Sequence, residues 1–511
     1  MLKKMKKTIL FAALMILSLV GCTEKLDEPQ LNNNFAGSTD FTKTENMKLS
    51  IIGAYEAFQS RGWEQPLLIS VRGDDVNSGG LGDQQDFTET DLFNYNKDYW
   101  MYNSLWENTY VDVVSTHTAM DLIKKYQEFA DPTGVALGDQ YIAEAKVLRA
   151  IMLFDISRVW GDVFLTKTSD TSELLNVTVV PTKAEVMQHL SDQMDEAIPM
   201  LPDMHPNQRQ DLPGGVTKYT ALAIKALANQ ELKNYQAVAE ATGQIINSGK
   251  FALFSDFYEL FKTPGKLANE NILEIQYSDF NKGTGDREAH LYAPYGPQGW
   301  TPTIAGSESG WGFYEPSMKF IKFMLDRGET VRLETSVLFT NRGIAEIQKD
   351  AAYATLPSFV KNTTRDGDKI NDYARAFFAS GKHYLPSKQL ITGRTSYGSN
   401  KNYTIIRYAE ILLTYAEALK QGASQTAISA DQAVNLVRQR AGLIPISGVT
   451  LDNILDEKFA ELGMEWGKRY YDMIRLERYS ELSYDGRTFT ADKKYLPYPQ
   501  GQVDQFPILG K

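Results

Sequence analysis

Cysteine is almost absent from this chain of 511 residues, in which Cys22 is the only one. A lone cysteine excludes a disulfide within the chain, so a hydrophobic core has to hold the fold together. The composition permits such a core, because 43% of the residues are hydrophobic and 11% are aromatic.

Histidine is scarce as well, and its scattered positions match no metal-ligand spacing: His117, His189, His205, His290 and His383. We therefore predict neither a metal site nor a cofactor. Common enzyme motifs are missing, including GxSxG, HExxH and the phosphate-binding loop. A glycoside hydrolase needs two carboxylates that flank the scissile bond, and no motif supports Asp74, Asp75 or Glu107 in that role. The sequence predicts a protein that is not an enzyme.

Positive charge is also in short supply. The chain has 53 Lys and Arg residues against 64 Asp and Glu residues, which gives a formal net charge of −11. No cluster of basic residues interleaved with aromatic residues occurs. Because nucleic-acid binding depends on neutralising phosphates, the sequence indicates no nucleic-acid partner.

The apolar run at the N-terminus is too short to span a membrane as a helix. Thr8 to Val20 is 13 residues long, whereas a spanning helix needs roughly 20. Four lysines precede the run and small residues follow it, a layout typical of an export signal. We predict a signal peptide at residues 1–21, and loss of its four lysines takes the formal net charge from −11 to −15.

Leu19-Val20-Gly21-Cys22 resembles the bacterial lipobox. In a lipobox protein the cysteine sulfur carries a diacylglycerol and the freed amine carries a further acyl chain, such as palmitate. The resemblance implies lipidation at Cys22, with residues 22–45 as the lipidated N-terminus and a polar tether. Two or more acyl chains give lasting membrane attachment. The alternative is an incidental thiol.

Helical periodicity dominates the rest of the chain. Apolar residues recur at steps of three and four and predict helices at 49–58, 100–126, 141–160, 183–201, 218–232, 234–248, 405–419, 431–440 and 451–466. The segment 141–160 is apolar on two sides, so we expect neighbouring helices on both sides of it. The short gap between 218–232 and 234–248 predicts an antiparallel hairpin that resembles a tetratricopeptide helix pair.

Two regions lack this periodicity. Residues 66–100 are rich in Gly, Asp, Asn and Gln and are predicted to form a long ordered loop. Residues 251–400 are predicted to be a loop-rich insertion with short strands such as 271–277, and the tail at 495–507 is expected to be extended. Long loops in compact proteins are more often functional than idle. We predict one mainly α body, residues 46–511, that carries both loop regions.

Charged residues also follow a pattern along the predicted helices. Arg407, Glu410, Thr414 and Glu417 form a narrow polar stripe on the helix predicted at 405–419. We favour a structural role for this stripe, with Arg438 or Arg440 as its partners. Glu465 and Arg469 are four residues apart, which is the spacing of an ion pair within a helix.

Four stretches together resemble the SusD/RagB-like outer-membrane lipoproteins of Bacteroidetes. They are residues 144–150 continuing to 160–165, residues 406–418, residues 435–442, and residues 461–475. Phe164 departs from the pattern, because relatives commonly have a proline there. The resemblance covers nearly the whole mature chain and implies tetratricopeptide-like helix pairs that support a loop-rich ligand face.

The resemblance also implies a role on the outside of the cell. Members are lipid-anchored at the cell surface, bind a nutrient and deliver it to a SusC-like TonB-dependent transporter in the outer membrane. The nutrient is an oligosaccharide or, in some members, a peptide. A pure protein-interaction scaffold and a glycoside hydrolase remain as alternatives from other functional classes.

Recognition of a neutral sugar requires flat aromatic faces for its C–H surfaces and planar polar groups for its hydroxyls. The family places ligand contacts in two regions, which correspond here to residues 66–100 and 290–300. The ligand-binding residues predicted on this basis are Arg72, Asp75, Asn77, Trp100, Tyr292, Tyr295 and Trp300. Trp100 could instead belong to the core, Asp75 could form a turn, and Trp311 is expected to pack.

Overall fold

The structure is a computed structural model that describes residues 39–59, 64–79, 83–170, 173, 175–277, 292–390 and 400–510. The predicted signal peptide, Cys22 and the first part of the tether lie outside these residues. The fold is mainly α with short strands, which confirms the predicted fold class. The ring of Phe41 packs edge to face on Tyr126 with centroids 4.9 Å apart, so the end of the tether contacts the helical body.

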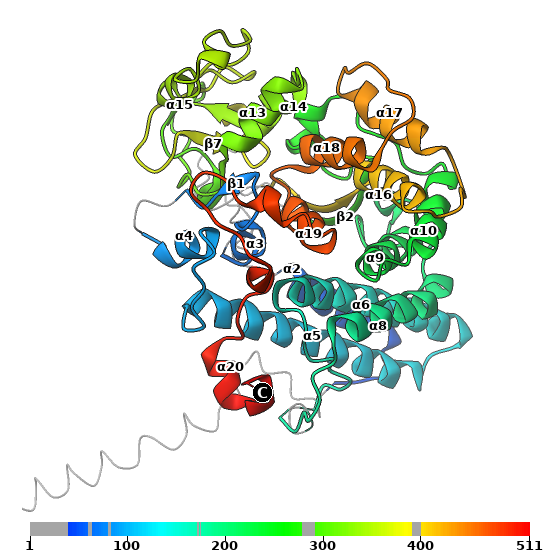
Figure 1. Ribbon diagram of the computed structural model, residues 1–511. Coiled ribbons are helices and arrows are strands. Elements are labelled where there is room, and N and C mark those ends of the chain that lie inside the picture. The colour runs from blue at the N-terminus through cyan, green and yellow to red at the C-terminus, as the bar shows by residue number, and fades with distance from the viewer. Residues whose placement is uncertain are drawn as a thin grey trace, which may run out of the picture.

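Long helices stack into a body (Figure 1). They are α2 (Met47–Gln59), α5 (Trp100–Gln127), α6 (Pro132–Trp160), α8 (Lys183–Ala197), α9 (Lys218–Glu231), α10 (Tyr235–Asn247), α16 (Tyr408–Lys420), α17 (Ala430–Arg440), α18 (Leu451–Leu462) and α19 (Lys468–Arg475). From α5 to α10 each long helix packs on the next, and α10 then packs on α16. This succession of antiparallel pairs is the tetratricopeptide-like architecture that the sequence predicts.

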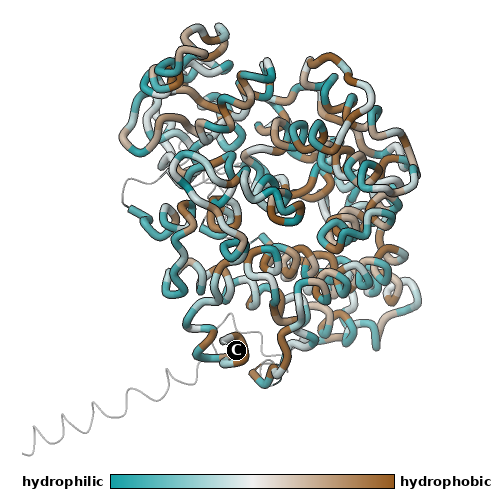
Figure 2. The backbone as a smooth tube through the Cα atoms, viewed as in Figure 1, coloured by the Kyte–Doolittle hydropathy of each residue, from teal (hydrophilic) through white to brown (hydrophobic). Residues whose placement is uncertain are grey.

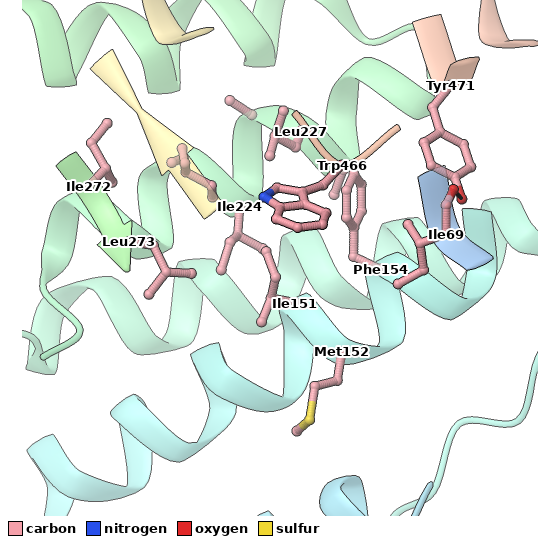
Figure 3. Packing of buried hydrophobic residues seen from close by; sticks show 14 of the residues in the cluster. Ile69, Ile151, Met152, Phe154, Ile224, Leu227, Ile272, Leu273, Trp466 and Tyr471 are labelled. Carbon is pink, nitrogen blue, oxygen red and sulfur yellow. Dashed lines mark hydrogen bonds between the residues drawn. The ribbon is translucent and has the colours of Figure 1, made fainter. Parts of the chain in front are cut away.

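Helix α6 lies between neighbours on two sides. It packs on α2 and α5 as well as on α8 and α9. Figure 3 shows Ile151 and Phe154 on the side of α6 that faces Leu227 of α9, whereas Met152 points to the opposite side. All four side chains are buried. The prediction that this helix is apolar on two sides because it is sandwiched is confirmed.

Local sequence sets where these helices begin. Helix α6 begins at Pro132, and the carboxylate of the preceding Asp131 accepts the backbone N–H of Gly134 at 2.7 Å. Helix α8 begins with a capping box between Thr182 and Glu185. Hydrophobic and hydrophilic residues alternate along the helices, as expected for elements with one buried side (Figure 2).

The loop-rich insertion is bounded by one pair of strands. Strand β2 (Asn271–Ile275) pairs antiparallel with β8 (Tyr403–Arg407), and α16 follows β8 directly. The strand predicted at 271–277 is confirmed. The helix predicted from residue 405 begins instead at Tyr408, because the β-branched residues 404–406 continue the strand.

Between these strands the described residues form short elements. They are α12 (Tyr292–Tyr295), β3 (Trp300–Thr301), β4 (Glu315–Pro316), α13 (Met318–Asp326), α14 (Val331–Ser336), β5 (Val337–Phe339), α15 (Asn341–Ile347), β6 (Lys369–Ile370) and β7 (Phe378–Ser380), with α11 (Phe257–Leu260) just before β2. Strand β3 pairs with β6, and β5 pairs with β7. The predicted loop-rich character with short strands is confirmed.

Two predicted loop or extended segments contain regular structure. Residues 66–100 include α3 (Glu64–Ser70), β1 (Val76–Asn77) and α4 (Gln85–Asp91), and β1 pairs with β4 of the insertion. The tail contains α20 (Gln500–Gln505). The predictions of an unbroken loop and an extended tail were wrong because helices of six or seven residues are too short to produce a periodic pattern.

Buried ion pairs join the insertion to the C-terminal helices. The guanidinium of Arg407 lies 2.7 Å from a carboxylate oxygen of Glu270, 2.5 Å from Glu461 and 2.8 Å from Glu465. The two acids of the stripe pair in the same way, since Glu410 contacts Lys468 and Glu417 contacts Lys458 and Arg475. The structural role predicted for the stripe is confirmed.

The partners predicted for these charges were wrong. Arg440 does not bind the stripe but the same acids as Arg407, namely Glu270 and Glu461, and Arg438 pairs with Glu457. Glu465 and Arg469 do not pair with each other, because α18 ends at Leu462 and a turn separates them. Arg469 pairs with Asp74 instead.

Among the residues described, none of the helices combines the length and the apolar character required to cross a membrane. Within the same part of the chain, His, Cys, Asp and Glu side chains do not gather in groups of three or more that could hold a metal ion.

Candidate functional site

Three of the described tryptophans keep exposed surface. Trp100 is 47% exposed, and Trp300 and Trp311 are half-buried. The other described tryptophans, Trp106, Trp160 and Trp466, are buried. An exposed indole costs hydrophobic stabilisation, so rings held at the surface by neighbouring aromatic residues are candidates for ligand contact.

Trp300 is fixed by strand pairing and by one aromatic neighbour. In the β3–β6 pair it lies opposite Ile370, and its ring meets Tyr384 edge to face with centroids 6.3 Å apart. Tyr384 is itself fixed, because its hydroxyl donates to the carboxylate of Asp368. The indole therefore has one packed side and one side that retains access to solvent.

Trp311 stands at the other end of the same exposed loop. Residues on both sides of the loop are tied together, since the N–H groups of Gly312 and Phe313 donate to the carbonyls of Gly296 and Pro294, each at 2.9 Å. The loop between Trp300 and Trp311 is mostly exposed and is closed at its base by these bonds. Trp311 also packs against the main core, as the sequence predicts, but part of its surface stays accessible.

An arginine connects this loop to the segment that precedes Trp100. Arg375 forms a two-bond pair with Asp83, in which Nη1 lies 2.6 Å from Oδ1, and its guanidinium stacks 4.2 Å from the ring centroid of Phe313. Asp83 precedes α4, and Phe87 of α4 contacts Trp100 edge to face at 6.1 Å. In Figure 1, β7, β1 and α4 follow one another along one side of the molecule. We call the surface that carries Trp100, Trp300 and Trp311 the tryptophan face.

Arg72 belongs to the interior. Its side chain is 1% exposed, its guanidinium lies 4.4 Å from the ring centroid of Tyr470, and Nη1 donates to the Tyr470 hydroxyl at 3.1 Å. These contacts join the first loop region to α19. As placed, Arg72 has no surface for a ligand, and we assign it a structural role.

Asp75 is also 1% exposed. Its Oδ2 accepts the backbone N–H of Met464 at 2.7 Å, and burial raises the pKa of the carboxyl to about 6. The neighbouring Asp74 is paired with Arg469 and Lys319. Asp75 therefore secures the turn between α18 and α19 and, as placed, has no surface for a ligand.

The remaining candidates differ in accessibility. Asn77 is half-buried, and its amide oxygen accepts from Nη2 of Arg487 at 2.8 Å, so its polar groups are engaged within the protein. Tyr295 is 0% exposed and packs among Tyr314, His383 and Trp466. Tyr292 begins α12, but its side chain lies outside the described part. Among the six predicted residues whose side chains are described, Trp100 and Trp300 are the aromatic residues that retain exposed surface.

Two models of protein families match the chain. One, described as "SusD family", matches residues 269–507, and the other, described as "Starch-binding associating with outer membrane", matches residues 28–227. Together they extend from the tether to the C-terminal tail. The chain belongs to the SusD/RagB-like family.

Similar proteins extend over nearly the whole chain. SusD-like protein P2 from Formosa agariphila is 24% identical, and the match covers 94% of this chain and 92% of that protein. A SusD-like protein from Bacteroides ovatus is 22% identical, and the match covers 99% of this chain and 98% of that protein. Among solved structures, surface glycan-binding protein A from Bacteroides thetaiotaomicron, in complex with laminarihexaose, has a TM-score of 0.72 at 24% identity, covering 91% of this chain and 98% of that one. Surface glycan-binding protein A from Bacteroides fluxus has a TM-score of 0.73 at 21% identity, and the match covers 90% of this chain and 96% of that one. These structures share the fold of this SusD/RagB-like chain.

Sequence reasoning missed two features of the site. The sequence predicts that Trp311 packs but does not predict its exposed surface, because the flanking glycines do not indicate which edge of the ring faces solvent. The Arg375–Asp83 pair spans 292 positions, so no local spacing could reveal it. A long-range pair between two loops becomes visible only when the fold places them together.

Proposed function

We propose that this SusD/RagB-like protein binds an oligosaccharide on the tryptophan face. The observation that carries the proposal is the pair Trp300 and Trp311, which flank one exposed loop and are each supported on one side by packed residues. An indole face offers a large contact area to the C–H surface of a pyranose at little cost in rotamer entropy. Similarity to surface glycan-binding proteins of known structure supports the same ligand class.

The polar contacts of the proposed site come from the same loops. The loop between Trp300 and Trp311 exposes Thr301 and Thr303, and the Asp83 carboxylate that Arg375 orients is about half exposed. Hydroxyl and carboxylate groups next to flat rings set the orientation of a bound sugar. We propose binding without hydrolysis, because the buried acids of this region are engaged by protein groups.

Substitution of the three tryptophans tests the site. We expect Trp300→Ala, Trp311→Ala and Trp100→Ala each to reduce retention of the protein on affinity gels that contain a polysaccharide, by roughly tenfold in affinity for one lost stacking contact. Phe129→Ala is the matched control, because Phe129 is an aromatic residue, 55% exposed, beyond the end of α5. Unchanged retention of all three tryptophan variants would refute the proposed site.

We further propose that the protein is lipid-anchored at the cell surface through Cys22 and passes its ligand to a SusC-like TonB-dependent transporter. An acyl-anchored binding protein raises the local ligand concentration at the transporter's mouth. Copurification from detergent-solubilised outer membranes tests the partnership, and recovery of this protein alone would contradict it.

Peptide binding is the alternative within the same family, and hydrolysis is the alternative from another class. A panel of oligosaccharides and peptides on the same affinity support separates the two ligand classes. New reducing ends after incubation with the purified protein would contradict the proposal of binding without hydrolysis.

A further inference from the structure

Glu315 is a buried acid at the point where the two loop regions meet. It lies in β4, it is 8% exposed, and its partner in β1 is Asn77. Strand β1 belongs to the loop region 66–100, whereas β4 belongs to the insertion. A buried carboxyl group needs hydrogen-bond donors, and Glu315 receives them from both loop regions.

Two of these donors come from the insertion. Oε1 of Glu315 accepts the backbone N–H groups of Phe377 and Phe378, at 2.6 and 3.1 Å. Both groups lie at the start of β7, on the side of the molecule where β7, β1 and α4 follow one another (Figure 1). Hydrogen bonds from N–H groups to a carboxylate are charge-assisted, so they hold the backbone firmly at this point.

The backbone held in this way carries Arg375. This arginine stands two residues before Phe377, its guanidinium lies 4.2 Å from the ring centroid of Phe313, and it pairs with Asp83. Phe313 follows Trp311 by two positions, at the base of the exposed loop. One chain of contacts therefore leads from the Glu315 carboxylate through β7 and Arg375 to the tryptophan face.

A second chain of contacts leads from Glu315 to Trp100. Oε2 lies 3.5 Å from the amide nitrogen of Asn77, and the amide oxygen of Asn77 accepts from Nη2 of Arg487 at 2.8 Å. The same Nη2 lies 2.9 Å from Oδ2 of Asp91, which belongs to α4. An aromatic ring of α4 contacts Trp100 edge to face.

The donors around Glu315 fit its ionised form. Oε1 faces two N–H groups and Oε2 faces the amide nitrogen of Asn77, so both oxygens are placed as acceptors. A protonated carboxyl group carries an O–H donor, which would oppose another donor at either oxygen. Turning the Asn77 amide does not remove the conflict, because it would break the hydrogen bond from Arg487.

The carboxyl group titrates near neutral pH. Burial raises the pKa of Glu315 to about 7, against the opposing effects of the N–H groups of Phe377 and Phe378 and of the charge of Arg342. An exposed glutamate has a pKa of about 4.3. Glu315 is therefore mostly ionised at pH 8 and mostly protonated at pH 6.

The charged and titratable neighbours of Glu315 come from several elements. They are Asp75 before β1, Asp91 of α4, Arg342 of α15, Tyr373 and Arg375 before β7, and Tyr484 and Arg487 of the C-terminal segment. The arginines stay charged, and burial raises the pKa of both tyrosines, so these groups keep their charge between pH 6 and pH 8. Burial also raises the pKa of Asp91, against the charge of Arg487, and that of Asp75 to about 6.

We propose that Glu315 is a positioning residue for the tryptophan face. Its negative charge holds the start of β7 in place for Trp311 and the side chain of Asn77 in place for Trp100. This inference rests on the proposed oligosaccharide-binding function and adds its regulation, because glycan binding then depends on the ionisation of Glu315. The ionised form is the competent one, so binding is strongest above pH 7 and weakens as the pH falls.

Accessibility of the tryptophan rings tests the proposal without a ligand. Hydroxyl-radical labelling, read by mass spectrometry, gives the reactivity of single tryptophans in the full-length protein at pH 8 and at pH 6. Relative to Trp160, which is buried in α6, we expect the labelling of Trp100 and Trp311 to rise at pH 6. Equal labelling of both residues at the two pH values would overturn the proposal.

Glu315→Gln separates the charge from the fold. Its amide oxygen can still accept the N–H groups of β7, whereas its amide nitrogen opposes Asn77 as a protonated carboxyl group does. At pH 8 the variant should label as the parent does at pH 6, and its labelling should not change with pH. A change with pH that survives in this variant would overturn the proposal, and the pH profile of the parent is a test that does not depend on the variant.

Two variants control for other acids. Glu274→Gln is the matched control, because burial raises the pKa of Glu274 to about 7 as well, while its carboxylate accepts from the N–H of Leu267 in another part of the fold. Asp75→Asn controls for the acid next to β1. Both variants should keep the pH dependence of the parent. Its loss in one of them, together with its persistence in Glu315→Gln, would assign it to a different acid.

Glycan affinity measures the consequence for function. Calorimetry at pH 8 and pH 6 uses maltohexaose, cellohexaose and xylohexaose, which are neutral and add no titrating group. If only the ionised form binds, the competent fraction falls from about 0.9 at pH 8 to about 0.09 at pH 6, and the affinity of the parent falls about tenfold. Glu315→Gln should bind weakly at both pH values.

The two proposals can fail separately. If a hexaose binds, Trp300→Ala weakens its binding, and neither affinity nor labelling changes between pH 6 and pH 8, the tryptophan face stands and the role of Glu315 is refuted. If labelling follows the ionisation of Glu315 but Trp300→Ala leaves the affinity unchanged, Glu315 positions the rings and the proposed glycan site is refuted. If no hexaose binds, the labelling alone decides on Glu315.

Discussion

Oδ2 of Asp75 accepts the backbone N–H of Met464 at 2.7 Å, across 389 positions of the chain. Met464 belongs to a turn in which three residues have positive φ angles: Met464 at 67°, Trp466 at 52° and Gly467 at 77°. Left-handed backbone is unfavourable for residues other than glycine, so the two non-glycine positions need support from outside. Asp75 supplies that support at Met464, two residues before Trp466.

Removal of the Asp75 acceptor should destabilise the protein. Asp75→Ala leaves the Met464 N–H without its partner in the interior, which costs about 1–3 kcal/mol of unfolding free energy. Urea unfolding at pH 4, where the Asp75 carboxyl is neutral in the folded state, measures this difference without the contribution of its charge. A variant as stable as the parent would contradict the role of Asp75 in the turn.

The charge of Asp75 should have the opposite effect. Burial raises its pKa to about 6, above the value of about 3.9 for an exposed aspartate. The folded state therefore favours the neutral form, and the stability that this form contributes is present below about pH 4 and lost as the pH rises through 6. Asp75→Asn, which keeps an acceptor without the charge, should gain stability relative to the parent between pH 4 and pH 8. A difference that does not change with pH would contradict the raised pKa.

Arg407 should be indispensable for stability. Its guanidinium neutralises Glu270, Glu461 and Glu465, and although burial alone would raise the pKa of Glu465, the charges of Arg407 and Lys382 lower it to about 2. Arg407→Met leaves buried carboxylates without a partner and should lower the unfolding free energy by about 3–5 kcal/mol.

An exposed ion pair provides the comparison for Arg407. Lys349 pairs with Glu346 at 2.6 Å, but its side chain is 72% exposed. Lys349→Ala should therefore change the unfolding free energy by less than about 0.5 kcal/mol. Equal effects of the two substitutions in urea unfolding would show that burial does not set the strength of these pairs.

The same residues indicate what the sequence could and could not predict. The stripe from Arg407 to Glu417 was identified as structural because a polar line on an apolar helix needs partners, and that prediction is confirmed. Its partners could not be named, since Arg407 lies 54 positions from Glu461 and 137 from Glu270. Periodicity describes one element at a time, whereas ion pairs between elements depend on tertiary packing.

The candidate site was harder to predict than the helices for a similar reason. The glycine-rich loop predicts accessible rings for tryptophan and tyrosine alike. Tyr295 is nevertheless 0% exposed among Tyr314, His383 and Trp466, whereas Trp300 is half-buried. Loop residues have no period that separates their buried side from their exposed side. The burial of Lys262 and Lys382 gave no local signal at all, because lysine is normally exposed.

Lipidation at Cys22 remains a prediction from the lipobox. Cys22→Ser should abolish incorporation of labelled palmitate and release the protein from the outer-membrane fraction, since the acyl chains would be its attachment. Mass spectrometry of the native N-terminus is the direct measurement. An uncut leader or an unmodified thiol would contradict the predicted anchor.

The central claim is that a glycan binds the tryptophan face. Hydrogen–deuterium exchange, measured with and without oligosaccharides of the polysaccharide that the protein retains most strongly on affinity gels, tests it most directly. We expect slower exchange in the segments around Trp300 to Trp311 and from Asp83 to Trp100, with helices α8 to α10 unchanged. Protection confined to those helices, with the tryptophan loops exchanging as in the free protein, would contradict the claim.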